Sequence, residues 1–133
     1  MTVDAANINK LKIRAKESFD LAVSYGANRQ EGIAILMKSG LILTGYSQVS
    51  PDLNAAKDAL RGPLNDTTGH LSRQKIRGEF EIVAIIIVTK NEKSNPHKST
   101  LKIINDFVGT SNSQIIKIMA ADTEAMRDIT QSP

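Results

Sequence analysis

The stretch that most constrains the fold is residues 80–89, FEIVAIIIVT, a nearly uninterrupted run of apolar and mainly β-branched side chains. A strand with one solvent-exposed face alternates apolar and polar residues, whereas a strand that is buried on both faces is a continuous apolar run in the sequence. The run is far shorter than the roughly 18 residues that a membrane-spanning helix requires. It therefore predicts a central strand in a sheet that is covered on both faces.

The segments before this strand predict a helix, a hairpin and a second helix. Residues 4–24 place apolar side chains three and four positions apart, as on an amphipathic helix. Two short apolar runs, residues 33–37 and 41–43, flank the turn sequence KSG and predict a β-hairpin. Ser50-Pro51 is typical of a helix start, with the serine as its cap.

The segments after the strand predict one more helix and one more strand. Asn95-Pro96 is expected to begin the helix, with the asparagine as its cap, and residues 114–120 predict the strand. The tail is expected to hold a short helix. This order of elements predicts a three-layer α/β/α sandwich with a mixed sheet, formed by a single domain over residues 1–133.

Composition narrows the kinds of site that are possible. The chain has no cysteine and only two histidines, His70 and His97. The lack of cysteine excludes disulfides, thiol nucleophiles and cysteine-bound zinc. Because no apolar run spans a bilayer and the amino terminus lacks an apolar signal segment, we expect a cytoplasmic protein with no membrane contact. The net charge of +3 permits an acidic partner without requiring one.

The order of elements and their caps resembles the cytidine deaminase family over residues 13–119. SYGANRQEGIAILMKSGLILTGYS is similar to the opening hairpin of that family, and LNAAKDALRGPL is similar to its second helix, which carries C-A-E or H-A-E in active members. GEFEIVAIIIV resembles the next strand, and SNPHKSTLKIINDF resembles the third helix, which begins P-C-x-x-C. The resemblance implies a cytidine deaminase-like fold.

The resemblance also implies a zinc site, whose residues have changed in this chain. In the family, a Cys or His at one helix start and two Cys at the next hold the zinc, and a Glu moves the proton of the metal-bound water. Asn54 stands at the position of the first ligand and Ala56 at that of the Glu. His97 and Thr100 stand at the positions of the two Cys. Asn and Thr are poor zinc ligands, and Ala cannot carry a proton. We therefore predict a vestigial cleft with no metal, no cofactor and no deaminase activity.

The residues that meet the substrate in the family have changed as well. The family holds the ribose with G-x-N-x-E after the hairpin, where this chain has Ser47 and Val49, and its pyrimidine-contacting Phe falls on Arg29. Helix starts without a metal favour anions. We expect the cleft to hold water or a small anion such as a phosphate group, or to be filled by side chains. Possible ligand contacts are Arg29, Ser47, Lys98 and Ser99.

These observations favour a zinc-free, catalytically inactive protein that acts as a binding or scaffolding subunit, and the resemblance implies a homo-oligomer. One alternative is an enzyme of unknown reaction on the same fold that uses His97 and Lys98 for proton transfer. Another alternative is a basic nucleotide- or RNA-binding module built on Arg73, Lys75 and Arg77. No aromatic residues lie between these basic residues to stack on nucleic-acid bases. A solvated loop is therefore the simpler interpretation of this cluster.

Overall fold

The computed structural model describes residues 5–24, 26, 30–48, 54–61, 82–108 and 115–128. The helices and strands in these ranges are, in chain order, α1 (Ala5–Ser24), β1 (Gly32–Met37), β2 (Ile42–Tyr46), α2 (Ala55–Ala59), β3 (Ile82–Thr89), α5 (Lys98–Val108), β4 (Ile115–Ala120) and β5 (Met126–Asp128). The loop expected around Arg73, Lys75 and Arg77 lies outside the described ranges. Within those ranges, no helix is long and apolar enough to cross a membrane.

The strands form one sheet in the order β2-β1-β3-β4-β5, so β3 lies in its middle. β3 and β4 run parallel, and the other neighbouring pairs are antiparallel, which makes the sheet mixed. All β3 side chains are buried except that of Val83, which is half-buried. The prediction of a central strand covered on both faces is confirmed.

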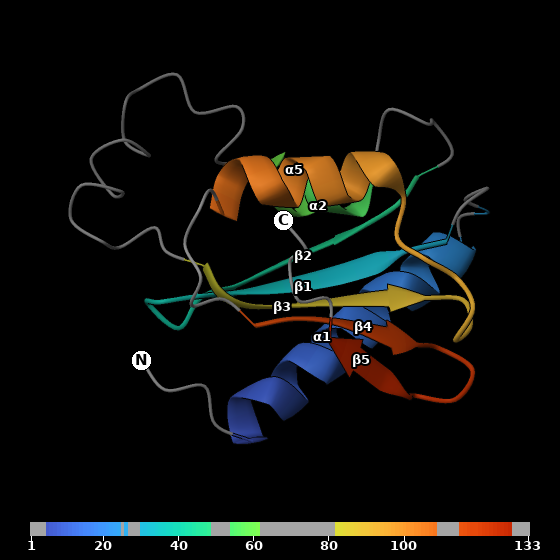
Figure 1. The fold of residues 1–133 in the computed structure, drawn as a ribbon, viewed down its shortest axis with the longest axis horizontal. Helices are drawn as coiled ribbons and strands as arrows, with labels where there is room; N and C mark the ends of the chain where they lie inside the picture. The colour runs from blue at the N-terminus through green and yellow to red at the C-terminus, as the bar shows by residue number, and fades with distance from the viewer. Residues whose placement is uncertain are drawn as a thin grey trace.

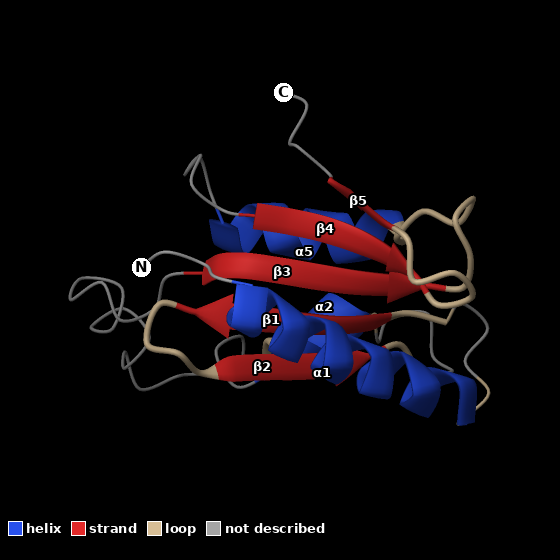
Figure 2. Ribbon diagram, turned by 90° about the horizontal axis from the view of Figure 1, so that it is seen from below, coloured by secondary structure: helices blue, strands red, loops and turns tan. Residues whose placement is uncertain are grey.

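Helices cover both faces of this sheet. α1 lies on one face, whereas α2 and α5 lie on the other (Figure 1 and Figure 2). One buried apolar cluster, which includes Ile85 and Ile104, fills the side of α2 and α5, and a second, which includes Leu11 and Ile86, fills the side of α1. From Ala84 to Val88, neighbouring β3 residues join opposite clusters because side chains alternate along a strand. The predicted three-layer α/β/α sandwich is confirmed.

Two glycines bring helices close to the first two strands. A Cβ on Gly32 would lie 2.2 Å from the backbone nitrogen of Phe19 in α1, and a Cβ on Gly45 would lie 2.3 Å from that of Ala59 in α2. Both distances are far below van der Waals contact, so only glycine allows these approaches. Gly45 pairs with Ile33, the residue after Gly32. One end of the hairpin therefore determines where α1 and α2 cross the sheet.

The cap of α2 and the first part of the tail differ from the prediction. α2 begins after Asn54, whose side-chain oxygen accepts the Lys57 N–H at 2.8 Å, so Asn54 rather than Ser50 caps this helix. Asn is as good a cap as Ser, and the sequence pattern did not distinguish the two positions. The tail forms β5 rather than a helix, because it pairs with β4 and its Asp128 forms an ion pair with Lys117 at 3.0 Å.

Candidate functional site

The candidate site lies where the starts of α2 and α5 meet. The Nδ2 of Asn54, the cap of α2, donates to the Oγ of Ser99 in the first turn of α5 at 3.2 Å. Asn54 is buried and Ser99 is half-buried. The two residues are 45 positions apart in the sequence, so their contact depends on the tertiary fold. The structure thus brings together two of the predicted residues from different helices.

His97 directly precedes α5 and takes part in the same cluster. Its carbonyl accepts the N–H of Leu101 at 3.2 Å, so the helix begins after His97 and not after Asn95 as predicted. Its Nδ1 accepts the backbone N–H of Ser99 at 3.1 Å and lies 2.6 Å from the Ser99 Oγ. Because Nδ1 accepts from an N–H, we assign the Ser99 hydroxyl as its second donor. Hydrogen bonds therefore run from Asn54 through Ser99 to His97.

A glutamate that the sequence did not single out reaches the start of α5. Glu31 precedes β1 and is only 2% exposed. Its Oε2 accepts the backbone N–H of His97 at 2.6 Å, and its Oε1 accepts the hydroxyl of Thr100, a fully buried residue, at 2.8 Å. Such charge-assisted bonds are short and strong, and a helix start favours negative charge. The carboxylate bridges the two positions that the resemblance assigns to zinc-binding cysteines.

The end of the hairpin fixes the backbone of Glu31. The N–H of Glu31 donates to the Oγ of Ser47 at 2.9 Å, and the N–H of Ser47 donates to the Glu31 carbonyl at 3.0 Å. Ser47 is itself buried. These bonds extend the pairing of β1 and β2 by one position. Ser47 therefore joins the site through the backbone of Glu31.

The groups at this site do not fit the zinc that the resemblance implies. The Oδ1 of Asn54 accepts the Lys57 N–H, and the hydroxyl of Thr100 donates to Glu31. Ala56 is buried and offers no donor atom on its side chain. Among the described residues, no three His, Cys, Asp or Glu side chains lie close enough to share a metal ion, whereas protein zinc sites use three or four such ligands. The arrangement is instead a hydrogen-bonded cluster around a carboxylate.

A polar cavity of about 430 Å³ lies beside this cluster, at the carboxyl end of β3. The residues that line it are Gln30, Glu31, Thr89, Lys90, Lys93, Ser94 and Asn95. Lys90 and Lys93 are exposed, and neither forms an ion pair with a described residue. Ligands of open α/β sheets bind at the carboxyl ends of the strands, so this position suits a ligand.

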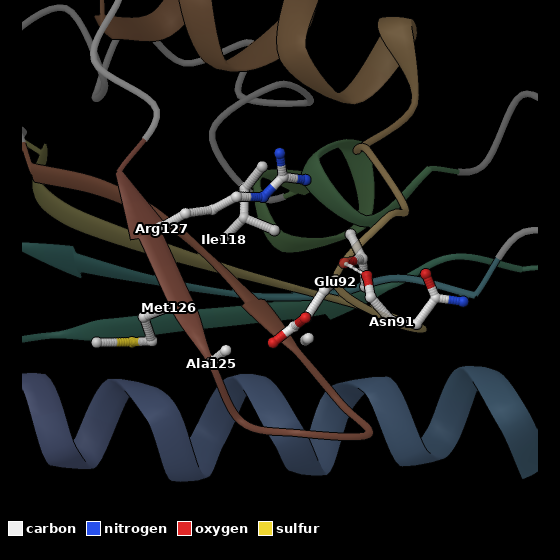
Figure 3. Close-up of a pocket in the computed structure, with 8 residues that line it drawn as sticks. Asn91, Glu92, Ile118, Ala125, Met126 and Arg127 are labelled. Atoms are coloured by element: carbon white, nitrogen blue, oxygen red, sulfur yellow. Dashed lines mark hydrogen bonds between the residues drawn. The ribbon is translucent and has the colours of Figure 1, made fainter.

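A second cavity, of about 170 Å³, lies between the β4–β5 hairpin and the loop that leads into α5 (Figure 3). Arg127 of β5 lines it, and its Nη2 donates to the carbonyl of Ser94 at 2.7 Å and to the Oδ1 of Asn95 at 2.9 Å. The Thr123 hydroxyl donates to a carboxylate oxygen of Glu92 at 3.2 Å. These bonds connect the hairpin to the loop that forms one wall of the polar cavity.

Of the other predicted candidates, only Lys98 lies among the described residues. Lys98 is exposed at the first position of α5. Arg29 and the basic residues Arg73, Lys75 and Arg77 lie outside the described residues. Their predicted roles stay predictions.

The sequence held one signal that could have identified Glu31. This glutamate directly precedes GIAILM, which forms β1 and is buried at every position. An ionisable side chain next to a fully buried strand must find hydrogen-bond donors inside the fold, because burying an unpaired charge is very costly. The pattern could therefore have shown that Glu31 needed partners, although not which partners.

Comparison with known proteins gives a result at the level of structure. No protein-family model matches this sequence, and no curated protein matches it by sequence. The structure is similar to that of cytidine deaminase from Mycobacterium leprae, with a TM-score of 0.53, 16% sequence identity and 92% of each chain covered. It is also similar to cytidine deaminase from Mycobacterium tuberculosis, with a TM-score of 0.53, 14% identity and 83% of each chain covered. At these identities the likeness establishes the fold alone, and the chain has the fold of the cytidine deaminases, as its sequence predicted.

Proposed function

We propose that this protein is a zinc-free, catalytically inactive relative of the deaminases that acts as a binding or scaffolding subunit. The observation that carries the proposal is the Glu31 carboxylate at the start of α5, where it accepts from the His97 N–H and the Thr100 hydroxyl. In a zinc deaminase, the anionic groups at this place are metal-bound thiolates. Here a carboxylate of the chain itself supplies the negative charge that a helix start favours.

The chemistry of the remaining positions supports the same proposal. Deamination needs a metal-activated water and a carboxylate that moves its protons. Ala56 stands at the position of that carboxylate and is buried. Glu31 does not replace it, because its two oxygens are bound to His97 and Thr100 and the described residues offer no metal-ligand group beside it that could hold the water. We therefore expect binding without turnover of cytidine.

Metal content and deaminase activity test this proposal together. Protein expressed in zinc-supplemented medium should contain far less than one zinc per chain by elemental analysis. It should form no uridine from cytidine beyond that formed by a heat-denatured sample. One zinc per chain, or uridine formation that is lost in the His97→Ala variant, would contradict the proposal.

The scaffolding part of the proposal includes self-association. α1 exposes three large apolar side chains, Ile13 (54%), Leu21 (43%) and Val23 (45%), which a second copy can bury. Sedimentation should therefore detect a dimer or a larger assembly, which Ile13→Ser together with Leu21→Ser weakens. Leu41→Ser, which changes a similarly exposed side chain next to the hairpin turn, is the matched control. A strict monomer at all concentrations would refute this part.

The enzyme alternative is less consistent with the geometry. His97 is exposed, and its Nδ1 already accepts the N–H and the hydroxyl of Ser99 within the same turn. This local pattern is that of a helix cap. A general base must reach a substrate proton with a free ring nitrogen, and at His97 only Nε2 remains for that purpose.

A further inference from the structure

We propose that the polar cavity beside α5 binds a small zwitterion, a molecule with a protonated amine near Glu31 and a carboxylate or phosphate near Lys90 and Lys93. This inference deepens the proposed function and rests on it, since it assumes a site that binds without turnover. The cavity volume of about 430 Å³ lies in the range of pockets that hold small ligands.

The pairing of Glu31 is incomplete within the described part of the chain. This residue is almost fully buried, and the described residues that donate to its carboxylate are neutral, namely the His97 N–H and the Thr100 hydroxyl. No described Lys, Arg or His forms an ion pair with it. Buried carboxylates are usually paired with a cation, and an ionised carboxylate accepts about four hydrogen bonds. The carboxylate of Glu31 therefore retains lone pairs for a cationic donor, and the residue forms part of the cavity wall.

The cavity also carries positive charge. Lys90 and Lys93 both line it, and neither is paired with a described acidic side chain. The acidic residue between them, Glu92, lines the other cavity instead (Figure 3). Its carboxylate accepts the Thr123 hydroxyl. The loop thus places its lysines on the polar cavity and its glutamate away from it. Two cations at one rim attract an anionic group.

Hydrogen bonds already hold the cavity wall in place before any ligand arrives. Arg127 binds Ser94 and Asn95, which belong to the same wall as the two lysines. Binding costs less when the loops of a site are already ordered. The ligand must satisfy both ends, because Glu31 repels a simple anion and the lysines repel a simple cation.

Three probes with the same six-carbon chain test the two charges separately. 6-Aminohexanoate carries both charges, hexanoate only the negative one, and hexylammonium only the positive one. Titration of each into the full chain, followed by amide chemical shifts, should give the tightest binding for 6-aminohexanoate. Each single-charge probe should bind at least about tenfold more weakly than 6-aminohexanoate, since a hydrogen bond to a charged group is lost.

Matched variants assign the two ends of the cavity. The double variant Lys90→Gln with Lys93→Gln should weaken 6-aminohexanoate binding about tenfold. The control, Lys10→Gln with Lys102→Gln, removes the same charge from exposed helix positions and should leave the binding unchanged. Glu31→Gln should remove the preference for 6-aminohexanoate over hexanoate. If Glu31→Gln fails to fold, the lysine variants and the three probes still decide the outcome.

The inference is overturned if the three probes bind equally, if none binds, or if the lysine variant matches its control. These failures are distinct from failure of the proposed function, which is detected by zinc content and uridine formation. If the protein is inactive and zinc-free but does not bind 6-aminohexanoate, only the proposal about the ligand is refuted. A zinc-containing, active protein refutes the proposed function.

Discussion

The starts of α2 and α5 lie next to each other, yet different parts of the chain close them. α2 has five residues and is capped by Asn54, which binds the N–H of Lys57 three positions later. α5 has eleven residues, and the N–H of His97, the residue just before it, is bound by the carboxylate of Glu31, which is 66 positions away. The start of α2 is thus closed by a local, neutral group, whereas the start of α5 combines a local group, the His97 Nδ1 on the Ser99 N–H, with a distant, charged one.

This contrast shows where the fold depends on long-range contacts. A local cap contributes about 1 kcal/mol to stability. A buried carboxylate that accepts two hydrogen bonds contributes more, because its removal leaves buried donors without partners. We therefore expect substitutions at Glu31 to destabilise the protein more than substitutions at Asn54.

The largest effect is expected for Glu31→Ala. The change leaves the His97 N–H and the buried Thr100 hydroxyl without their acceptor, which should lower the free energy of unfolding by about 3 kcal/mol. Urea denaturation measures the loss. Glu17→Ala removes a carboxylate from the exposed side of α1 and should change stability by less than about 0.5 kcal/mol. Equal effects of the two substitutions would mean that Glu31 does not hold α5.

A smaller loss is expected for Gly45→Ala, which tests whether close packing rather than its cap holds α2. The new Cβ would lie 2.3 Å from the Ala59 nitrogen and 2.5 Å from the Ala55 carbonyl oxygen, so α2 must shift at a cost of about 2 kcal/mol. Thermal unfolding measures this loss. Gly26→Ala meets nothing within 4 Å but has a φ of +69°, and should cost only about 1 kcal/mol. A Gly45→Ala protein as stable as wild type would refute the close approach.

Asn54→Ala should cost about 1 kcal/mol, because the α2 cap and the bond to Ser99 are lost. Asn54→Asp retains the cap acceptor for the Lys57 N–H and should lose less. Both are measured by urea denaturation alongside the Glu31 variants. If Asn54→Ala is as harmful as Glu31→Ala, the contrast between the two helix starts disappears.

The smallest effect is expected for Arg127→Gln, about 0.5 kcal/mol in global stability, because the lost bonds are exposed. Its clearer readout is local. The Ser94 N–H, bound to the Asn91 carbonyl at 3.0 Å, should exchange faster with solvent once the loop loses its brace. Asp128→Asn also alters β5 by removing its ion pair with Lys117, but should leave this exchange rate unchanged. Identical exchange in both variants would show that Arg127 does not brace the loop.

The sequence predicted those parts of the structure that depend on local patterns. The apolar run that forms β3, the hairpin of β1 and β2, and the amphipathic α1 each follow from spacing alone. The sequence also identified Asn54, His97 and Thr100 as positions at two adjoining helix starts. It mistook which residue caps each helix, because Ser, Asn and His side chains compete for the same backbone donors over a few positions.

The partner of α5 could not be predicted from the sequence in this way. Glu31 reaches His97 and Thr100 only after β1 and β3 have paired and α5 has packed on the sheet. No periodicity relates positions 66 and 69 residues apart. β5 was missed for a related reason, since its pairing with β4 outweighs the local preference of the tail.

The most direct test of the account is a double-mutant cycle between Glu31→Gln and Thr100→Val. The hydroxyl of Thr100 donates to the Oε1 of Glu31 at 2.8 Å, and both residues are buried. If the carboxylate holds the start of α5, the two substitutions should be non-additive in the free energy of unfolding, with a coupling energy of about 1–2 kcal/mol. Additive effects, with a coupling energy near zero, would contradict the claim that the Glu31 carboxylate holds this helix start.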